Sequence, residues 1–124
     1  MCIDRLSVCL LLLSLSLSLG CVTRQAEWSM ALKNVGKDEI EDSTLKCGRF
    51  YYRPGILSSR TDAEFYCGHE SIPENATIRW YRKGGEWRER QVNVKGAIPV
   101  GFKGCIYVQI DDSDQVVVSP KVRP

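Results

Sequence analysis

Short segments in which apolar and polar residues alternate are the feature that most constrains the fold of this chain. Residues 27–33 and 76–82 both carry their large apolar side chains at every second position. A period of two places those side chains on one face of a β-strand. Because no part of the sequence beyond residue 20 sustains a 3.6-residue repeat, we predict an all-β domain.

Turn-forming residues separate further segments of this kind. The expected extended segments are 27–33, a short one opening at Ile40, then 44–52, 61–67, 76–82, 86–94, 105–110 and 116–118. Gly48 is expected to form a bulge, and Arg53-Pro54-Gly55 is expected to end the strand that contains it. About seven strands predict a single antiparallel β-sandwich, Ig-like or transthyretin-like, over residues 27–120.

The first 21 residues predict an export signal. Arg5 precedes a run rich in leucine and serine from Leu6 to Leu19, and Gly20 and Cys21 follow it. The run is shorter than the roughly 20 apolar residues that a membrane-spanning helix needs. We therefore expect residues 1–20 to be removed as a signal peptide and the polar residues 21–26 to form a tether.

Ser18-Leu19-Gly20-Cys21 resembles the lipobox of bacterial lipoproteins, although Ser18 and Leu19 exchange the usual order of leucine and a small residue. The resemblance implies a thioether-linked diacylglycerol on Cys21, usually with an amide-linked third chain, and hence anchoring to a membrane through lipid. Valine in place of aspartate at position 22 implies, in a Gram-negative host, the periplasmic face of the outer membrane rather than the inner membrane.

An ordinary signal peptide cleaved near Gly20 is the alternative, and it would leave Cys21 as a plain thiol of a secreted protein. Asn75-Ala76-Thr77 fits the acceptor pattern for N-glycosylation, which would matter only in a eukaryotic host.

The segment from Trp28 to Val118 resembles a loosely defined class of small bacterial lipoproteins. The resemblance is carried by Pro73-Glu74-Asn75-Ala76-Thr77-Ile78-Arg79-Trp80 and by the hairpins around it. It implies a β fold and carries no activity with it.

Three of the six cysteines remain for the exported domain, because Cys2 and Cys9 lie in the leader and Cys21 would be acylated. In an oxidising compartment we expect one disulfide among Cys47, Cys67 and Cys105, and the sequence does not choose the pair. Such a bridge would stabilise the fold by roughly 2–4 kcal/mol.

Charge and composition give no sign of catalysis or of a polyanionic partner. Lys and Arg total 17 against 15 Asp and Glu, a balance that argues against nucleic-acid binding. His69, the single histidine, lacks the paired Cys-x-x-Cys knuckles of a zinc site, and residues 111–114 lack the glycine and glutamate of a calcium loop. We therefore predict no metal, no cofactor and no enzymatic activity.

The segment 76–94 offers a candidate binding site, since Gly84 and Gly85 predict a hairpin turn within it. Trp80 is expected in the core, whereas Trp87, Arg88 and Tyr81 are the candidate contacts for a partner. Arg79 and Arg82 are expected to pair across this hairpin with Glu86 and Glu89.

The predicted function is that of a membrane-anchored envelope lipoprotein, a non-catalytic binding or accessory module. One specific version is an immunity protein that captures a secreted effector protein. The alternative is a secreted sandwich domain without a lipid anchor that binds a glycan or a protein.

Overall fold

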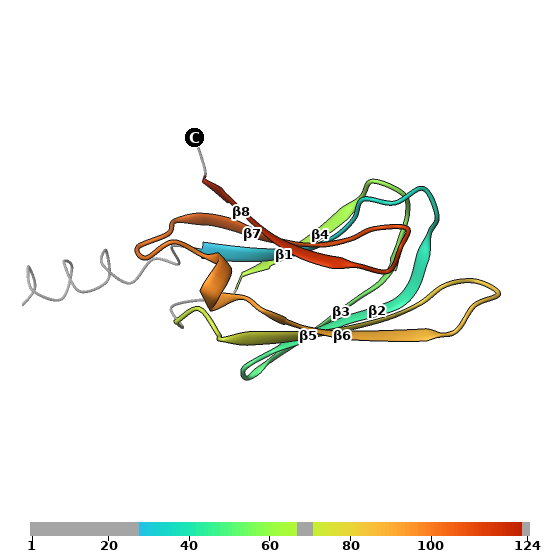
Figure 1. Ribbon diagram of the computed structural model, residues 1–124, viewed down its shortest axis with the longest axis horizontal. Helices are drawn as coiled ribbons and strands as arrows, with labels where there is room; N and C mark the ends of the chain where they lie inside the picture. Colours follow the sequence, from blue (N-terminus) through green and yellow to red (C-terminus); the bar gives the residue numbers. More distant parts are fainter. Residues whose placement is uncertain (1–27, 67–70, 123–124) are drawn as a thin grey trace, which may run out of the picture.

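The computed structural model describes residues 28–66 and 71–122, and Figure 1 shows two layers of strands packed face to face. Each layer contains four strands. The elements are β1 (Trp28–Asn34), β2 (Ile40–Cys47), β3 (Phe50–Leu57), β4 (Asp62–Tyr66), β5 (Asn75–Tyr81), β6 (Trp87–Asn93), a 3₁₀ turn η1 (Lys95–Ala97), β7 (Gly104–Ile110) and β8 (Val116–Val122). The prediction of a β-sandwich is confirmed.

The topology differs from the expected one in two details. One sheet has the order β4-β1-β7-β8 and the other β3-β2-β5-β6, so the described residues form eight strands, where about seven were expected from eight candidate segments. The pairing of β1 with β7 is parallel, with Trp28 opposite Gly104, whereas all other pairings are antiparallel. The predicted leader, the tether and Cys21 lie outside the described residues.

The chain around Gly48 forms a hairpin instead of one bent strand. Gly48 has φ +57° and begins the turn that joins β2 to β3, which explains why it is not a bulge. β3 then runs through Arg53-Pro54-Gly55, where the expected strand break was wrong. A proline in a central strand would cost the sheet a hydrogen bond, because proline has no backbone N–H. β3 is an edge strand and therefore tolerates Pro54.

The bulge lies earlier in the chain, in β2. The pairing of β2 with β3 shifts on either side of Ser43, and Asp42 next to it has φ +47°. The Ser43 hydroxyl is buried and donates to the carbonyl oxygen of Gly55 at 2.7 Å, so the irregular backbone is tied by a side chain.

The core lies between the two sheets and follows the alternation of the strands. Leu32 and Ile106 from one sheet and Ile78 and Trp80 from the other are fully buried. Burial of each such side chain stabilises the fold by about 1.5–3 kcal/mol relative to exposure. Within the described residues we find no helix of the length and apolarity that a bilayer crossing requires.

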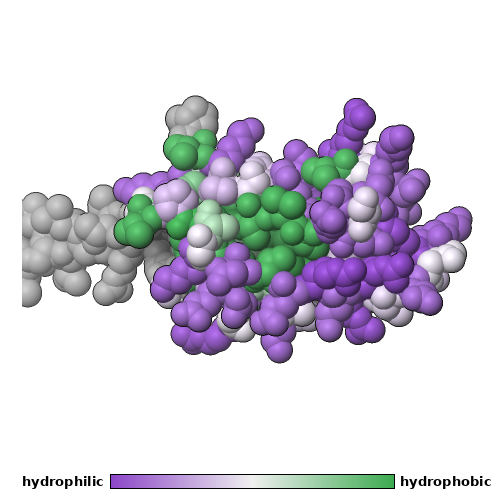
Figure 2. Space-filling view, in the orientation of Figure 1, coloured by the Kyte–Doolittle hydropathy of each residue, from purple (hydrophilic) through white to green (hydrophobic). Residues whose placement is uncertain are grey.

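One long side of the sandwich remains partly open. The edge strands β6 and β8 flank it, and Figure 2 shows hydrophobic surface between them. Val92, Val116 and Val118 pack against the core here and are only partly buried. The opening brings side chains of both sheets to one groove, which bears on the site below.

Candidate binding surface

Two aromatic rings and one guanidinium group gather on the outer face of the β5–β6 hairpin. The rings of Tyr81 and Trp87 lie 5.5 Å apart between centroids, with an interplanar angle of 50°. The guanidinium carbon of Arg79 lies 4.3 Å from the centroid of the Trp87 ring. Trp87 retains 46% of its surface exposed. We call Arg79, Tyr81 and Trp87 the Trp87 cluster.

Strand register explains why these three side chains meet. Ala76, Ile78 and Trp80 point into the core, so the odd-numbered residues of β5 face outward. Tyr81 pairs directly with Trp87, and Arg79 pairs with the next outward residue of β6, Glu89. Trp87 is therefore the neighbour of both.

Arg88 lies on the opposite face of β6 and does not join Trp87 and Tyr81. Consecutive residues of a strand point to opposite faces, and the Nε of Arg88 donates to Asp114 Oδ2 at 3.0 Å in the turn between β7 and β8. This ion pair and the accompanying hydrogen bond raise the pKa of Arg88. Of the three residues predicted to contact a partner, the structure brings together only Trp87 and Tyr81.

Asp114 links the two sheets at the end of the molecule that carries this hairpin. Its Oδ1 accepts hydrogen bonds from Arg82 Nε at 2.7 Å and from the indole Nε1 of Trp80 at 3.2 Å. Arg82 also donates from Nη2 to the carbonyl oxygen of Asp111 at 2.6 Å. The expected pairing of Arg82 with Glu86 or Glu89 was therefore wrong, because Arg82 pairs with Asp114 in the turn between β7 and β8.

The environment keeps Asp114 ionised. Burial alone would raise the pKa of Asp114, but the hydrogen bonds from Arg82, Arg88 and Trp80 outweigh it, so the pKa lies below its ordinary value. Asp114 adopts φ +59°, a conformation in which aspartate is one of the few tolerated residues. The turn between β7 and β8 thus binds the β5–β6 hairpin through the charged side chain of Asp114, and we call this contact the Asp114 clamp.

The other carboxylates of this turn also have protein partners. Asp111 Oδ1 accepts from the backbone N–H groups of Ser113 and Gln115, which closes the turn. Asp112 accepts from the N–H of Lys37 at 2.9 Å, and this lowers the pKa of Asp112. Residues 28–66 and 71–122 contain no group of three or more histidine, cysteine or acidic side chains arranged to hold a metal.

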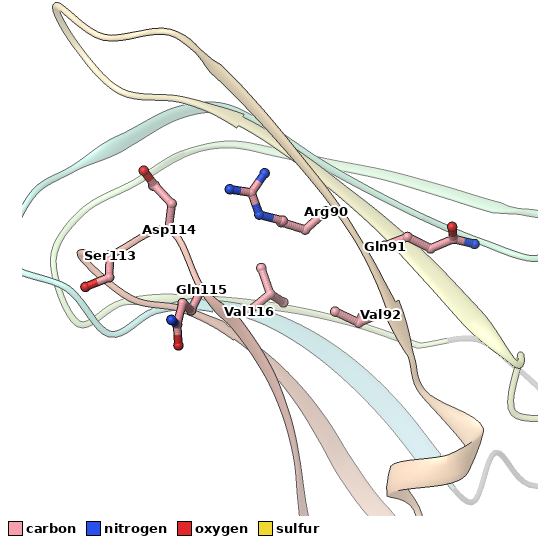
Figure 3. Close-up of a pocket in the computed structure, with 7 residues that line it drawn as sticks. All are labelled: Arg90, Gln91, Val92, Ser113, Asp114, Gln115 and Val116. Atoms are coloured by element: carbon pink, nitrogen blue, oxygen red, sulfur yellow. The ribbon is translucent and has the colours of Figure 1, made fainter.

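A groove of about 500 Å³ lies between β6 and β8 beside this clamp. Figure 3 shows Arg90 directed from β6 toward Asp114 and Val92 and Val116 lining the apolar part. Arg82 Nη1 is buried and donates no hydrogen bond to the described protein atoms. Most of the residues that line the groove are polar, and Val92 and Val116 supply its apolar part.

The cysteines lie in different layers. Cys47 is buried in the core from β2, whereas Cys105 is buried on the outer side of β7, where Ile106 and Val108 point inward. Cys67 and His69 lie outside the described residues. The disulfide remains a prediction, although the placement of Cys47 and Cys105 disfavours a bond between these two.

Comparison with known proteins adds a fold relationship and no function. No family model matches the chain, and no curated protein matches it. A protein from Eubacterium rectale, solved by NMR, is similar in structure with a TM-score of 0.51 and 13% sequence identity. The similarity covers 79% of this chain and 91% of that one, and at this identity it supports the shared fold alone.

Two features of this surface are not predicted by the sequence. The sequence predicts a salt bridge for Arg79, and its position over Trp87 follows only from the register of the two strands. Nothing in the local sequence around Asp114 indicates which residues its carboxylate contacts.

Proposed function

We propose that this protein is an envelope lipoprotein anchored through Cys21 and that its sandwich acts as a non-catalytic binding module. The observation that supports binding is the Trp87 cluster, which presents a half-exposed indole flanked by Tyr81 and Arg79 on an open sheet face. Trp, Tyr and Arg are the residue types that dominate binding energy at protein interfaces.

The scaffold around the cluster supports the same proposal. Binding costs less when the contacting side chains are already held in place. Asp114, in the turn between β7 and β8, holds the turn end of the β5–β6 hairpin through Trp80, Arg82 and Arg88. The Trp87 ring is further restrained by its contacts to Tyr81 and Arg79, so little side-chain freedom remains to be lost.

A protein partner is the favoured ligand class, and the specific version is a secreted effector that the anchored domain neutralises. Arg79 supports this version, because a guanidinium stacked on an indole still offers its edge donors to a carboxylate of a partner. The alternative is a glycan, which an exposed indole can bind by stacking without any charge.

The anchor is tested by intact mass. The wild-type protein isolated from its host is expected to begin at Cys21 and to carry the mass of a diacylglycerol and usually of a third acyl chain. The Cys21→Ser variant is expected to lose that mass and to leave the membrane fraction. A wild-type protein that begins near residue 21 without added lipid would support the secreted alternative.

Binding is tested with two named probes, the product of an effector gene adjacent to this one and isolated peptidoglycan. Trp87→Ala is expected to weaken binding of the effector by roughly thirtyfold or more, the range of an interface hot spot. Tyr51→Ala is the matched control, since Tyr51 is 65% exposed on β3 at the other edge of the same sheet.

The outcomes separate the alternatives. Equal loss with both variants, or no loss with either, would contradict a role for the Trp87 cluster. Binding of peptidoglycan in place of the effector, with the same dependence on Trp87, would favour the glycan alternative.

A further inference from the structure

The end of the sandwich at which β1 begins differs in chemistry from the opposite end. Trp28 opens β1 and lies in one row with Gly104 at the start of β7 and Val122 in β8. The connection 98–103 leads into β7, so it lies at this same end, as Figure 1 shows. We call this the β1-start end.

Two strongly exposed valines lie at the β1-start end. Val100 is fully exposed, at 106% of its reference surface, and Val122 is 71% exposed. Val100 also lines a cavity of about 380 Å³ together with Ile72, Ile98 and Pro99. Figure 2 shows hydrophobic groups at this end of the molecule. Val100 and the apolar residues that line this cavity form a surface that a partner outside the domain can cover.

Basic side chains surround these valines. Four basic residues and one acidic residue lie in the described loops of this end and in the last residues of β8. The basic residues are Arg49, Lys95, Lys103 and Lys121, and the acidic residue is Glu74. Lys95 and Lys121 are exposed, and Lys95 lines the same cavity as Val100.

The loops at the opposite end have the reverse balance. Six of their residues are acidic and four are basic. The acidic residues are Asp38, Glu39, Glu86, Asp111, Asp112 and Asp114. The basic residues are Lys37, Arg60, Arg82 and Lys83. The charges of the described loops are therefore polarised along the long axis of the domain, with a net positive charge at the β1-start end and a net negative charge at the other.

We propose that the β1-start end docks on an anionic bilayer surface, with Val100 entering the interface and the lysines contacting lipid phosphates. The proposal rests on the lipid anchor proposed above. Cys21 precedes Trp28 by a segment too short to reach much beyond 25 Å when extended. An anchor on Cys21 would thus keep the β1-start end within about 25 Å of the bilayer.

The physical terms agree with this orientation. A lysine near an anionic surface contributes binding worth about a fivefold change in affinity, and burial of apolar side chains at the interface adds to it. The acidic end would be repelled. Docking would leave the Trp87 cluster toward the end that faces away from the bilayer, where a partner could still reach it.

Photocrosslinking in vesicles tests the contact. The full-length protein carries p-benzoylphenylalanine in place of Val100 or, as a control at the opposite end, in place of Lys83. Each protein is reconstituted in vesicles of phosphatidylethanolamine with phosphatidylglycerol, or of phosphatidylcholine alone, and intact mass reports lipid adducts. We expect adducts from position 100 in the anionic vesicles, at several times the yield from position 83.

Charge reversal separates docking from mere proximity. Replacing Lys95, Lys103 and Lys121 by Glu is expected to lower the adduct yield at position 100 at least fivefold, whereas Lys83→Glu should not lower it. Equal yields from positions 100 and 83, or equal yields in anionic and neutral vesicles, would overturn the docking proposal.

Flotation of the same vesicles tests the anchor separately. Protein that floats with the vesicles but shows no preference for position 100 refutes the docking and leaves the anchor intact. Protein that does not float, yet crosslinks from position 100 in anionic vesicles, refutes the anchor and supports the surface.

Discussion

The carboxylate of Asp114, in the turn between β7 and β8, accepts a hydrogen bond from the indole N–H of Trp80 in the opposite sheet at 3.2 Å. Trp80 has no exposed surface, so its N–H requires a partner inside the protein. The bond joins the turn between β7 and β8 to the hairpin that presents Trp87.

Replacement of Asp114 tests how much this link stabilises the fold. Asp114→Ala removes the acceptor for Trp80 and Arg82 and is expected to lower the free energy of unfolding by roughly 2 kcal/mol, because both donors remain largely buried. Urea denaturation measures the change. Ser113→Ala, in the same turn but exposed, should have little effect, and an equally small effect of Asp114→Ala would contradict a stabilising clamp.

The lowered pKa of Asp114 predicts acid sensitivity. The folded protein holds this carboxylate ionised below its ordinary pKa of 3.8, so the unfolded chain binds the proton first as the pH falls. The stabilisation is complete well above pH 3.8 and is lost progressively below it. Urea denaturation over this range should show a shallower decline for Asp114→Asn, and parallel curves would show that other carboxylates control the loss.

The two tryptophans of the β5–β6 hairpin should respond differently to truncation. Trp80→Ala is expected to cost about 3–5 kcal/mol of unfolding free energy, since it empties a core position. Trp87→Ala should change it by only about 0.5 kcal/mol, because the ring is 46% exposed. Thermal melts compare them, and a large loss for Trp87→Ala would place its role in stability instead of binding.

Gly104 is expected to tolerate no side chain. A Cβ at this position would lie 2.2 Å from the carbonyl oxygen of Lys121, and φ is +149°. Gly104→Ala should therefore destabilise the protein by at least about 3 kcal/mol. Gly84→Ala is the control, with φ +74° and open space around it, and should cost about 1 kcal/mol. Similar costs for both would contradict the close approach of β7 and β8.

If the exported protein contains a disulfide, the bond should include Cys67. Cys47 lies within the core and Cys105 on the outer side of the other sheet, and packed sheets lie about 10 Å apart, beyond the roughly 7 Å between Cα atoms that a disulfide spans. Peptide mapping after alkylation under non-reducing conditions identifies the pair. A Cys47–Cys105 peptide would contradict this placement.

The alternation of residues was sufficient to predict the sandwich and most of its strands. β1, β5, β6 and β7 lie within a few residues of their expected bounds because each keeps a regular period of two. The turn at Gly48 was missed, since a glycine between two apolar stretches is compatible with either a bulge or a hairpin. Arg88 was grouped with Trp87 as a neighbour in sequence, whereas neighbours in a strand face opposite sides.

The parallel pairing of β1 with β7 also has a kinetic consequence. The first strand is central in its sheet, and one of its two partners is supplied by residues 104–110, near the other end of the chain. Such high contact order slows folding, because loop closure must precede the stabilising contacts. A nascent polypeptide could not complete this sheet until residues 104–110 had been synthesised.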